Sequence, residues 1–240
     1  MKPINLNEVA GLRYAKQNFC DCYLVAAISA LTRSKNGTEI LRQNIQREGR
    51  NYCIKFNDVN GHSERYLVKE AEMDSLILMN RFMEPIEPKI PHHPIIKALE
   101  VAMGKLLLAH PDKKPFICKI PHCQENFEYN KVSNFFKLFT GVRPITINES
   151  GLRMSLKHDK LVAKNLFEKL NGEDNFSFVL GSGYKGFFND LPHCWSVKRV
   201  VNSKIDLYDS RRQISSTYNP DNAIKRFKFI CGYFNDMLKL

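Results

Sequence analysis

The sequence predicts an α+β fold in which a helical N-terminal lobe is followed by a lobe built on an antiparallel β-sheet. A chain of 240 residues is long enough for one large domain or two lobes around a cleft. Helical spacing of apolar residues dominates the first part, and short β-branched and aromatic segments dominate the last part. We expect a single domain over 1–240, with lobes at about 1–141 and 142–240 and a cleft between them.

Helices are predicted where apolar residues recur at helical spacing. The first begins at Cys22, runs through an Ala-rich apolar stretch, and is expected to end near 33–37, where Asn36-Gly37 signals a stop. The other segments with this spacing are 38–47, 95–109, 131–139 and 155–170. The proline-rich stretch 83–94 predicts an extended connector.

Strands are predicted from alternation and from β-branched and aromatic residues. Segments 51–56 and 65–68 alternate around the turn residues 58–61 and predict a hairpin. Four later segments are expected to form one antiparallel sheet: 175–181, 193–201, 204–208 and 226–234. Residues 201–203 are expected to form the turn between the second and third of these strands.

The composition limits the classes of binding partner and the cellular compartment that we expect for the protein. The net charge is +11, with the basic residues scattered and no aromatic-plus-basic motif, so we expect a solvated basic surface rather than a nucleic-acid site. Attraction to an acidic protein partner or to a membrane surface is the alternative. No apolar run is long enough to span a membrane, and the first residues lack the apolar core of a signal peptide. An odd count of seven cysteines without a framework pattern favours free thiols in a reducing, cytoplasmic compartment.

Cofactors are not expected from these residues. His122-Cys123 and His193-Cys194 bring potential zinc ligands together, but no pair of cysteines and histidines has the spacing of a zinc finger or ribbon. We therefore expect neither a metal nor another cofactor.

Cys22 is the candidate nucleophile. It lies at the start of a predicted helix, where unpaired N–H groups and partial positive charge favour a thiolate and lower the pKa of a cysteine. The alternative is a buried free cysteine that packs as a small apolar side chain.

A base, an orienting acid and an oxyanion donor complete the candidate site. A hairpin centred on 201–203 is expected to bring Asp209 opposite His193, so that the acid holds the imidazole and stabilises its charged form. Gln17 lies close enough before Cys22 to donate its side-chain amide to the same oxyanion. Alternatively, His193 is a hydrogen-bonded sheet residue, Asp209 a turn residue and Gln17 a loop residue.

The order of these residues resembles the papain-like cysteine proteases, and most closely the calpain protease core. Segment 17–28 looks like the nucleophile block of that family, a Gln followed by Gly-Asp-Cys-Trp-Leu-Leu-Ala-Ala. Further segments resemble the family in the same order along the chain: 96–106 its Leu-Leu-Glu-Lys-Ala helix, 139–141 its Thr-Gly turn, 191–197 its Gly-His-Ala-Tyr-Ser-Val strand, and 205–211 its Arg-Asn-Pro-Trp-Gly segment.

The resemblance implies a papain-like fold and a thiol hydrolase that cleaves peptide or isopeptide bonds in a protein or peptide substrate. It gives Cys22, His193 and Asp209 the roles of the catalytic triad and Gln17 that of the oxyanion donor. The chain departs from the family in four ways: Gln17 is one residue closer to the cysteine, Cys20 replaces a small residue beside the nucleophile, Asp209 replaces the usual Asn, and the Pro-Trp-Gly sequence is absent.

Two other functions are compatible with the same residues. A thioester formed at the cysteine can pass to another nucleophile, as in a transferase, or arise from an amide side chain, as in a deamidase. A protease-like scaffold without activity could instead hold a partner. The Asp-containing triad resembles that of some bacterial effector proteases, which would place the protein in a host cell after secretion.

Overall fold

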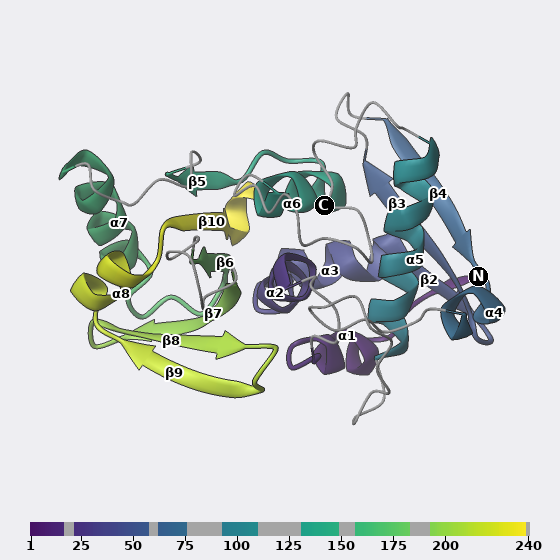
Figure 1. The fold of residues 1–240 in the computed structure, drawn as a ribbon, viewed down its shortest axis with the longest axis horizontal. Helices are drawn as coiled ribbons and strands as arrows, with labels where there is room; N and C mark the ends of the chain where they lie inside the picture. Colours follow the sequence, from purple (N-terminus) through teal and green to yellow (C-terminus); the bar gives the residue numbers. More distant parts are fainter. Residues whose placement is uncertain are drawn as a thin grey trace, which may run out of the picture.

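The computed structural model describes residues 1–16, 22–57, 62–75, 93–109, 131–148, 157–182 and 193–238. Two antiparallel sheets lie at opposite sides of the molecule, with helices α2, α3 and α6 between them (Figure 1). The expected α+β class is confirmed at this level. None of the helices in these ranges is long and apolar enough to cross a membrane.

The N-terminal part is not purely helical, because it contains a sheet in the order β1-β2-β3-β4. Its strands are β1 (Lys2–Pro3), β2 (Ile45–Glu48), β3 (Asn51–Asn57) and β4 (Ser63–Val68). Its helices are α1 (Leu6–Leu12), α2 (Cys22–Leu31), α3 (Lys35–Asn44), α4 (Glu70–Asp74), α5 (Pro94–Ala109) and α6 (Lys131–Thr140). The hairpin β3–β4 and helices α2, α5 and α6 lie where the sequence predicts them, whereas 45–47 belong to β2 rather than to a helix.

The expected stop at Asn36-Gly37 is wrong, because both residues lie in the first turn of α3. Ser34 is the N-cap of this helix, and its Oγ accepts a hydrogen bond from the N–H of Gly37 at 3.1 Å. A Cβ at Gly37 would lie 2.4 Å from the carbonyl oxygen of Leu31, so the glycine allows α2 and α3 to approach closely. Most of the expected connector 83–94 lies outside the described residues, and Pro94 is the first residue of α5.

The C-terminal part is a six-stranded antiparallel sheet in the order β5-β10-β6-β7-β8-β9. Its strands are β5 (Ile145–Ile147), β6 (Phe176–Gly181), β7 (Cys194–Val201), β8 (Lys204–Asp209), β9 (Ile214–Tyr218) and β10 (Phe229–Phe234), and its helices are α7 (Lys157–Lys169) and α8 (Pro220–Arg226). The four predicted strands correspond to β6, β7, β8 and β10. The short strand β5, the exposed strand β9 and helix α8 were not predicted.

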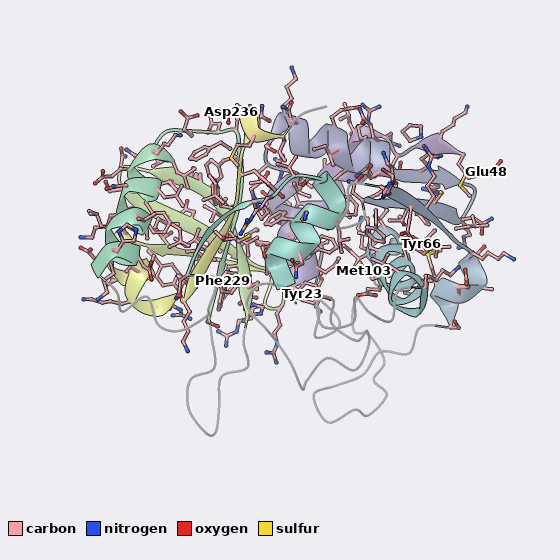
Figure 2. The ribbon with its side chains drawn as sticks, turned by 90° about the horizontal axis from the view of Figure 1, so that it is seen from above. Tyr23, Glu48, Tyr66, Met103, Phe229 and Asp236 are labelled. Carbon is pink, nitrogen blue, oxygen red and sulfur yellow. The ribbon has the colours of Figure 1, made fainter. Side chains whose placement is uncertain are left out.

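Helix α2 lies at the centre of the larger core. Apart from Cys22, whose side chain is not described, every residue of this helix is buried, as its Ala-rich sequence predicts. Figure 2 shows Tyr23 of α2 between Phe229 of the C-terminal sheet and Met103 of α5, and the three side chains belong to one hydrophobic cluster. A second cluster fills the space between the other face of the C-terminal sheet and helices α7 and α8. The helix that begins at Cys22 therefore packs directly on the sheet that carries His193 and Asp209.

Candidate functional site

His193 and Asp209 form a direct side-chain pair at one end of the C-terminal sheet. The distance from Nε2 of His193 to Oδ1 of Asp209 is 2.7 Å, and the two side chains are 12% and 8% exposed. His193 immediately precedes β7, and Asp209 is the last residue of β8. The expected contact between the two residues across this hairpin is therefore confirmed.

A β-bulge at 197–199 explains how the two side chains meet. Beyond the bulge, Ser196 lies opposite Tyr208, so these two side chains point to one face of the sheet. Because side chains alternate along a strand, Asp209 and His193 both fall on the other face. The contact is thus diagonal, with Asp209 two residues away from the position directly opposite His193.

Asp209 is held in the form of a carboxylate. Its Oδ1 accepts hydrogen bonds from the backbone N–H groups of Arg211 at 2.9 Å and Arg212 at 3.1 Å, in addition to its contact with His193. Burial acts to raise the pKa of Asp209, but the hydrogen bond and charge of His193 and the two backbone N–H groups outweigh it, and the pKa lies below its usual value. The acid is therefore ionised at neutral pH and oriented from three directions.

The backbone and ring of His193 are also fixed. Its N–H donates to Oγ of Ser182 at 3.2 Å, and its carbonyl accepts from the N–H of Ser182 at 2.9 Å. The indole of Trp195 meets the imidazole edge-to-face, with ring centroids 4.4 Å apart. Trp195 is itself almost fully buried, and the guanidinium of Arg226 lies 5.9 Å from its ring. His193 is thus held through its backbone, and its imidazole is held through Nε2 and one ring edge.

Two buried serine pairs join α2 to the C-terminal sheet. Oγ of Ser29, in the second half of α2, lies 3.0 Å from Oγ of Ser196 in β7. Oγ of Ser34, just after the helix, lies 2.8 Å from Oγ of Ser177 in β6. The two contacts fix both the position and the direction of α2 on the sheet.

The strand register gives this direction. Val179 of β6 lies opposite Ser196 of β7, so Ser177 lies farther from the end of the sheet at which His193 is found. Helix α2 therefore has its N-terminus toward the His193 end. Cys22 is about 10 Å of helix before the serine that contacts Ser196, and His193 is about 10 Å of strand before Ser196. The backbones of Cys22 and His193 are consequently expected at the same end of the sheet.

Of the four predicted site residues, the structure describes the side chains of His193 and Asp209 and brings them together. Cys22 is the first residue of α2, which agrees with its predicted place at a helix N-terminus, but only its backbone is described. Gln17 lies outside the described residues. The catalytic roles of all four residues stay predictions.

Sequence reasoning missed the polar side chains that hold the site's framework. Ser29, Ser196 and Ser177 are fully buried within apolar segments, and each makes a hydrogen bond between α2 or its end and the sheet. A serine inside a buried apolar run is the signal that could have identified them, because a buried hydroxyl needs a partner.

The described residues offer no alternative metal centre, since no three His, Cys, Asp or Glu side chains among them are grouped so as to hold an ion. A cavity of about 320 Å³ lies between the N-terminal sheet and helices α4 and α5. Its charged lining includes the ion pair of Arg50 with Glu70, and its lining residues come from elements other than those that carry His193 and Asp209.

No known protein-family model matches the chain, and a search of curated proteins finds no match.

Proposed function

We propose that the chain is a cysteine protease that cleaves peptide or isopeptide bonds through Cys22, His193 and Asp209, on a papain-like fold similar to the calpain core. The observation that carries this proposal is the largely buried pair of His193 and Asp209 at the end of the sheet toward which the N-terminus of α2 is directed. A protein or peptide is the proposed substrate. The cytoplasm, or a host cell reached by secretion, is the proposed place of action.

The geometry supports a defined proton path. With Nε2–H donating to the Asp209 carboxylate, Nδ1 is the basic nitrogen of the neutral imidazole. In the proposed mechanism Nδ1 of His193 takes the thiol proton of Cys22, and the thiolate attacks the carbonyl carbon. The Cys22 N–H and the Gln17 side chain stabilise the oxyanion. His193 then protonates the leaving amine, and water hydrolyses the thioester with His193 as the base.

The first experiment compares hydrolysis of fluorogenic peptide and ubiquitin-type substrates by the wild type and by Cys22→Ala, His193→Ala and Asp209→Ala. We expect a loss of about a hundredfold or more for each substitution, as for general acid–base groups. Cys53→Ala is the matched control, because Cys53 is a half-buried thiol of the N-terminal sheet, away from the proposed site. Equal activity of the wild type and Cys22→Ala would remove the proposal.

A second experiment separates an enzyme from a silent scaffold. Iodoacetamide should alkylate Cys22 before the other six cysteines at mildly acidic pH, because only a thiolate reacts at a useful rate. Mass spectrometry of the labelled peptides identifies the site. Uniform, slow labelling of all seven thiols would favour the binding protein, whose partner would be an acidic protein. Trapping the Cys22 adduct and identifying the released product distinguishes hydrolysis from transfer or deamidation.

A further inference from the structure

Ser196 and Tyr208 form a buried cross-strand pair next to the candidate site. They lie directly opposite each other in β7 and β8, three residues after His193 and one residue before Asp209. Both point to the face of the sheet opposite the imidazole–carboxylate pair, and both are buried. Strands β7 and β8 therefore each direct a hydroxyl to the face of the sheet that is opposite the His193–Asp209 pair, where α2 and the segment before it pack.

The hydroxyl of Ser196 reaches the chain before α2 through Ser29. Oγ of Ser29 donates its only hydrogen to the carbonyl oxygen of Arg13 at 2.7 Å. Ser196 must therefore be the donor in its 3.0 Å contact with Ser29. The result is a directed chain of hydrogen bonds from β7, through α2, to the backbone of Arg13.

The hydroxyl of Tyr208 reaches the next carbonyl without an intermediate. Its Oη donates to the carbonyl oxygen of Tyr14 at 3.0 Å. The two tyrosine rings meet edge-to-face, with centroids 5.4 Å apart. The carbonyl of Tyr14 is thus bonded by β8 directly, and that of Arg13 by Ser29 of α2, whose hydroxyl in turn contacts Ser196 of β7.

The side chain of Arg13 also bonds to the chain at the end of α2. Its Nη2 donates to the carbonyl of Thr32 at 2.7 Å, just beyond the C-terminal end of α2. The segment of Arg13 and Tyr14 is therefore bonded directly to β8, indirectly to β7 through Ser29, and to the C-terminal end of α2 at Ser29 and Thr32.

We infer that Ser196 and Tyr208 are positioning residues that set the distance between Cys22 and the His193–Asp209 pair. The inference rests on the proposed function. The inference extends the proposed function by assigning the alignment of nucleophile and base to these hydroxyls rather than to apolar packing alone. Loss of the Ser196 hydroxyl leaves the buried Oγ of Ser29 without its donor, and loss of the Tyr208 hydroxyl leaves the carbonyl of Tyr14 without its donor, so that α2 or the segment before it can shift. Misplacement by about 1 Å at a catalytic pair can cost about a hundredfold in rate.

The chain contains a matched control in Ser177. This serine is as fully buried as Ser196, and it bonds Ser34 across the same interface at a similar distance. Ser177 lies five residues from Ser182, the partner of His193 at the sheet end, which is about 17 Å of strand. Removing its hydroxyl costs a comparable buried hydrogen bond without touching the Arg13 or Tyr14 carbonyls.

The experiment compares Ser196→Ala, Tyr208→Phe and Ser177→Ala in the full chain. For each variant, the peptide-hydrolysis parameters kcat and KM, the pH profile of Cys22 alkylation by iodoacetamide, and the thermal midpoint are measured. We expect Ser196→Ala and Tyr208→Phe to lower kcat by about tenfold to a hundredfold with little change in KM. They should also move the alkylation profile of Cys22 toward that of an ordinary thiol. Ser177→Ala should lower the thermal midpoint similarly while leaving kcat and the alkylation profile as in the wild type.

The outcomes distinguish this inference from the proposed function. If the wild type cleaves substrate and Cys22 alkylates selectively, but Ser196→Ala and Tyr208→Phe behave like Ser177→Ala, the positioning role is refuted and the protease assignment stands. If Cys22 of the wild type is neither selectively alkylated nor required for cleavage, the proposed function fails, and the positioning role fails with it.

Discussion

His193 and Asp209 share one face of the C-terminal sheet because the bulge of β7 shifts the pairing of its hairpin by one residue. Continued from the turn without interruption, the register would put Asp209 opposite Ser196 and on the face away from the imidazole. The extra residue in β7 puts Tyr208, rather than Asp209, opposite Ser196. One backbone irregularity therefore assigns the acid to the side of the base and the two hydroxyls to the side of α2.

Two replacements of Asp209 should separate the effect of orienting His193 on kcat/KM from the effect of the carboxylate charge. Asp209→Ala removes the acceptor for Nε2 of His193 and for two backbone N–H groups, and we expect kcat/KM to fall by about a hundredfold. Asp209→Asn keeps a carbonyl oxygen that can accept these bonds, and we expect a loss of only about tenfold. Steady-state hydrolysis of a fluorogenic peptide measures both variants.

Asp206→Asn is the control for this series. Asp206 lies on the same strand and accepts hydrogen bonds from Arg199 and Thr217, both at 2.6 Å, without contacting His193. Its replacement should leave kcat/KM unchanged. Equal losses for the substitutions at 206 and 209 would mean that the strand, rather than the contact with His193, limits activity.

The stability contribution of Asp209 should depend on pH in a defined direction. Its pKa in the folded protein lies below the ordinary value of about 3.9, so the folded state binds its proton less readily than the unfolded state. The contribution is therefore fully present above about pH 4 and is lost as the pH falls through the depressed folded pKa. Urea unfolding should show that the wild type exceeds Asp209→Asn in unfolding free energy at pH 6 and that the gap narrows at pH 3. A gap independent of pH would contradict this origin.

The elements with strong local signals could be predicted from the sequence. The Ala-rich run of α2, the periodic helix α5 and the turn glycine Gly141, with φ of 73°, agree with the structure because local propensity and burial favour the same conformation. The turn at 201–203 and the strands on either side of it predicted that Asp209 would come near His193, whereas their place on one face of the sheet depends on the bulge.

The elements that depend on distant contacts could not be predicted. Strand β2 completes a sheet with β1 and β3, and this pairing decides the conformation of 45–48 over its helical periodicity. Taken alone, Gly37 indicates the end of a helix. In the structure it lies inside α3, where it allows close contact with Leu31. The bulge in β7 has no sequence signature, because its residues are ordinary strand residues and only the two-sided burial of the sheet fixes the register.

The only tryptophan of the chain should report on the protonation of His193. Its indole meets the imidazole edge-to-face with centroids 4.4 Å apart, and a charged imidazolium at this distance quenches indole fluorescence. We expect the fluorescence of the wild type to rise as the pH rises and the ring loses its proton, and the transition to be absent from His193→Ala. A transition that persists in His193→Ala would assign the quenching to another group.

The turn that joins β7 to β8 offers a test of the hairpin that aligns the site. Asn202 and Ser203 both have positive φ, 51° and 54°, as in the two-residue hairpin turn that favours Asn-Gly. Ser203→Gly should raise the unfolding free energy by about 0.5 kcal/mol, because relief of the left-handed conformation outweighs the added freedom of the unfolded chain. Ser203→Val should lower it by about 1 kcal/mol or more, since a β-branched residue is strained there.

Ser216 provides the matched control for this substitution, because it lies in the regular strand β9, opposite Leu207. Glycine in a strand costs about 0.5–1 kcal/mol, so Ser216→Gly should destabilise the protein where Ser203→Gly stabilises it. Chemical unfolding of the three variants gives the sign of each change. The stabilised Ser203→Gly variant should keep full kcat, because it strengthens the same register that brings His193 to Asp209. A stabilised variant with lower kcat would show instead that the hairpin must bend during turnover.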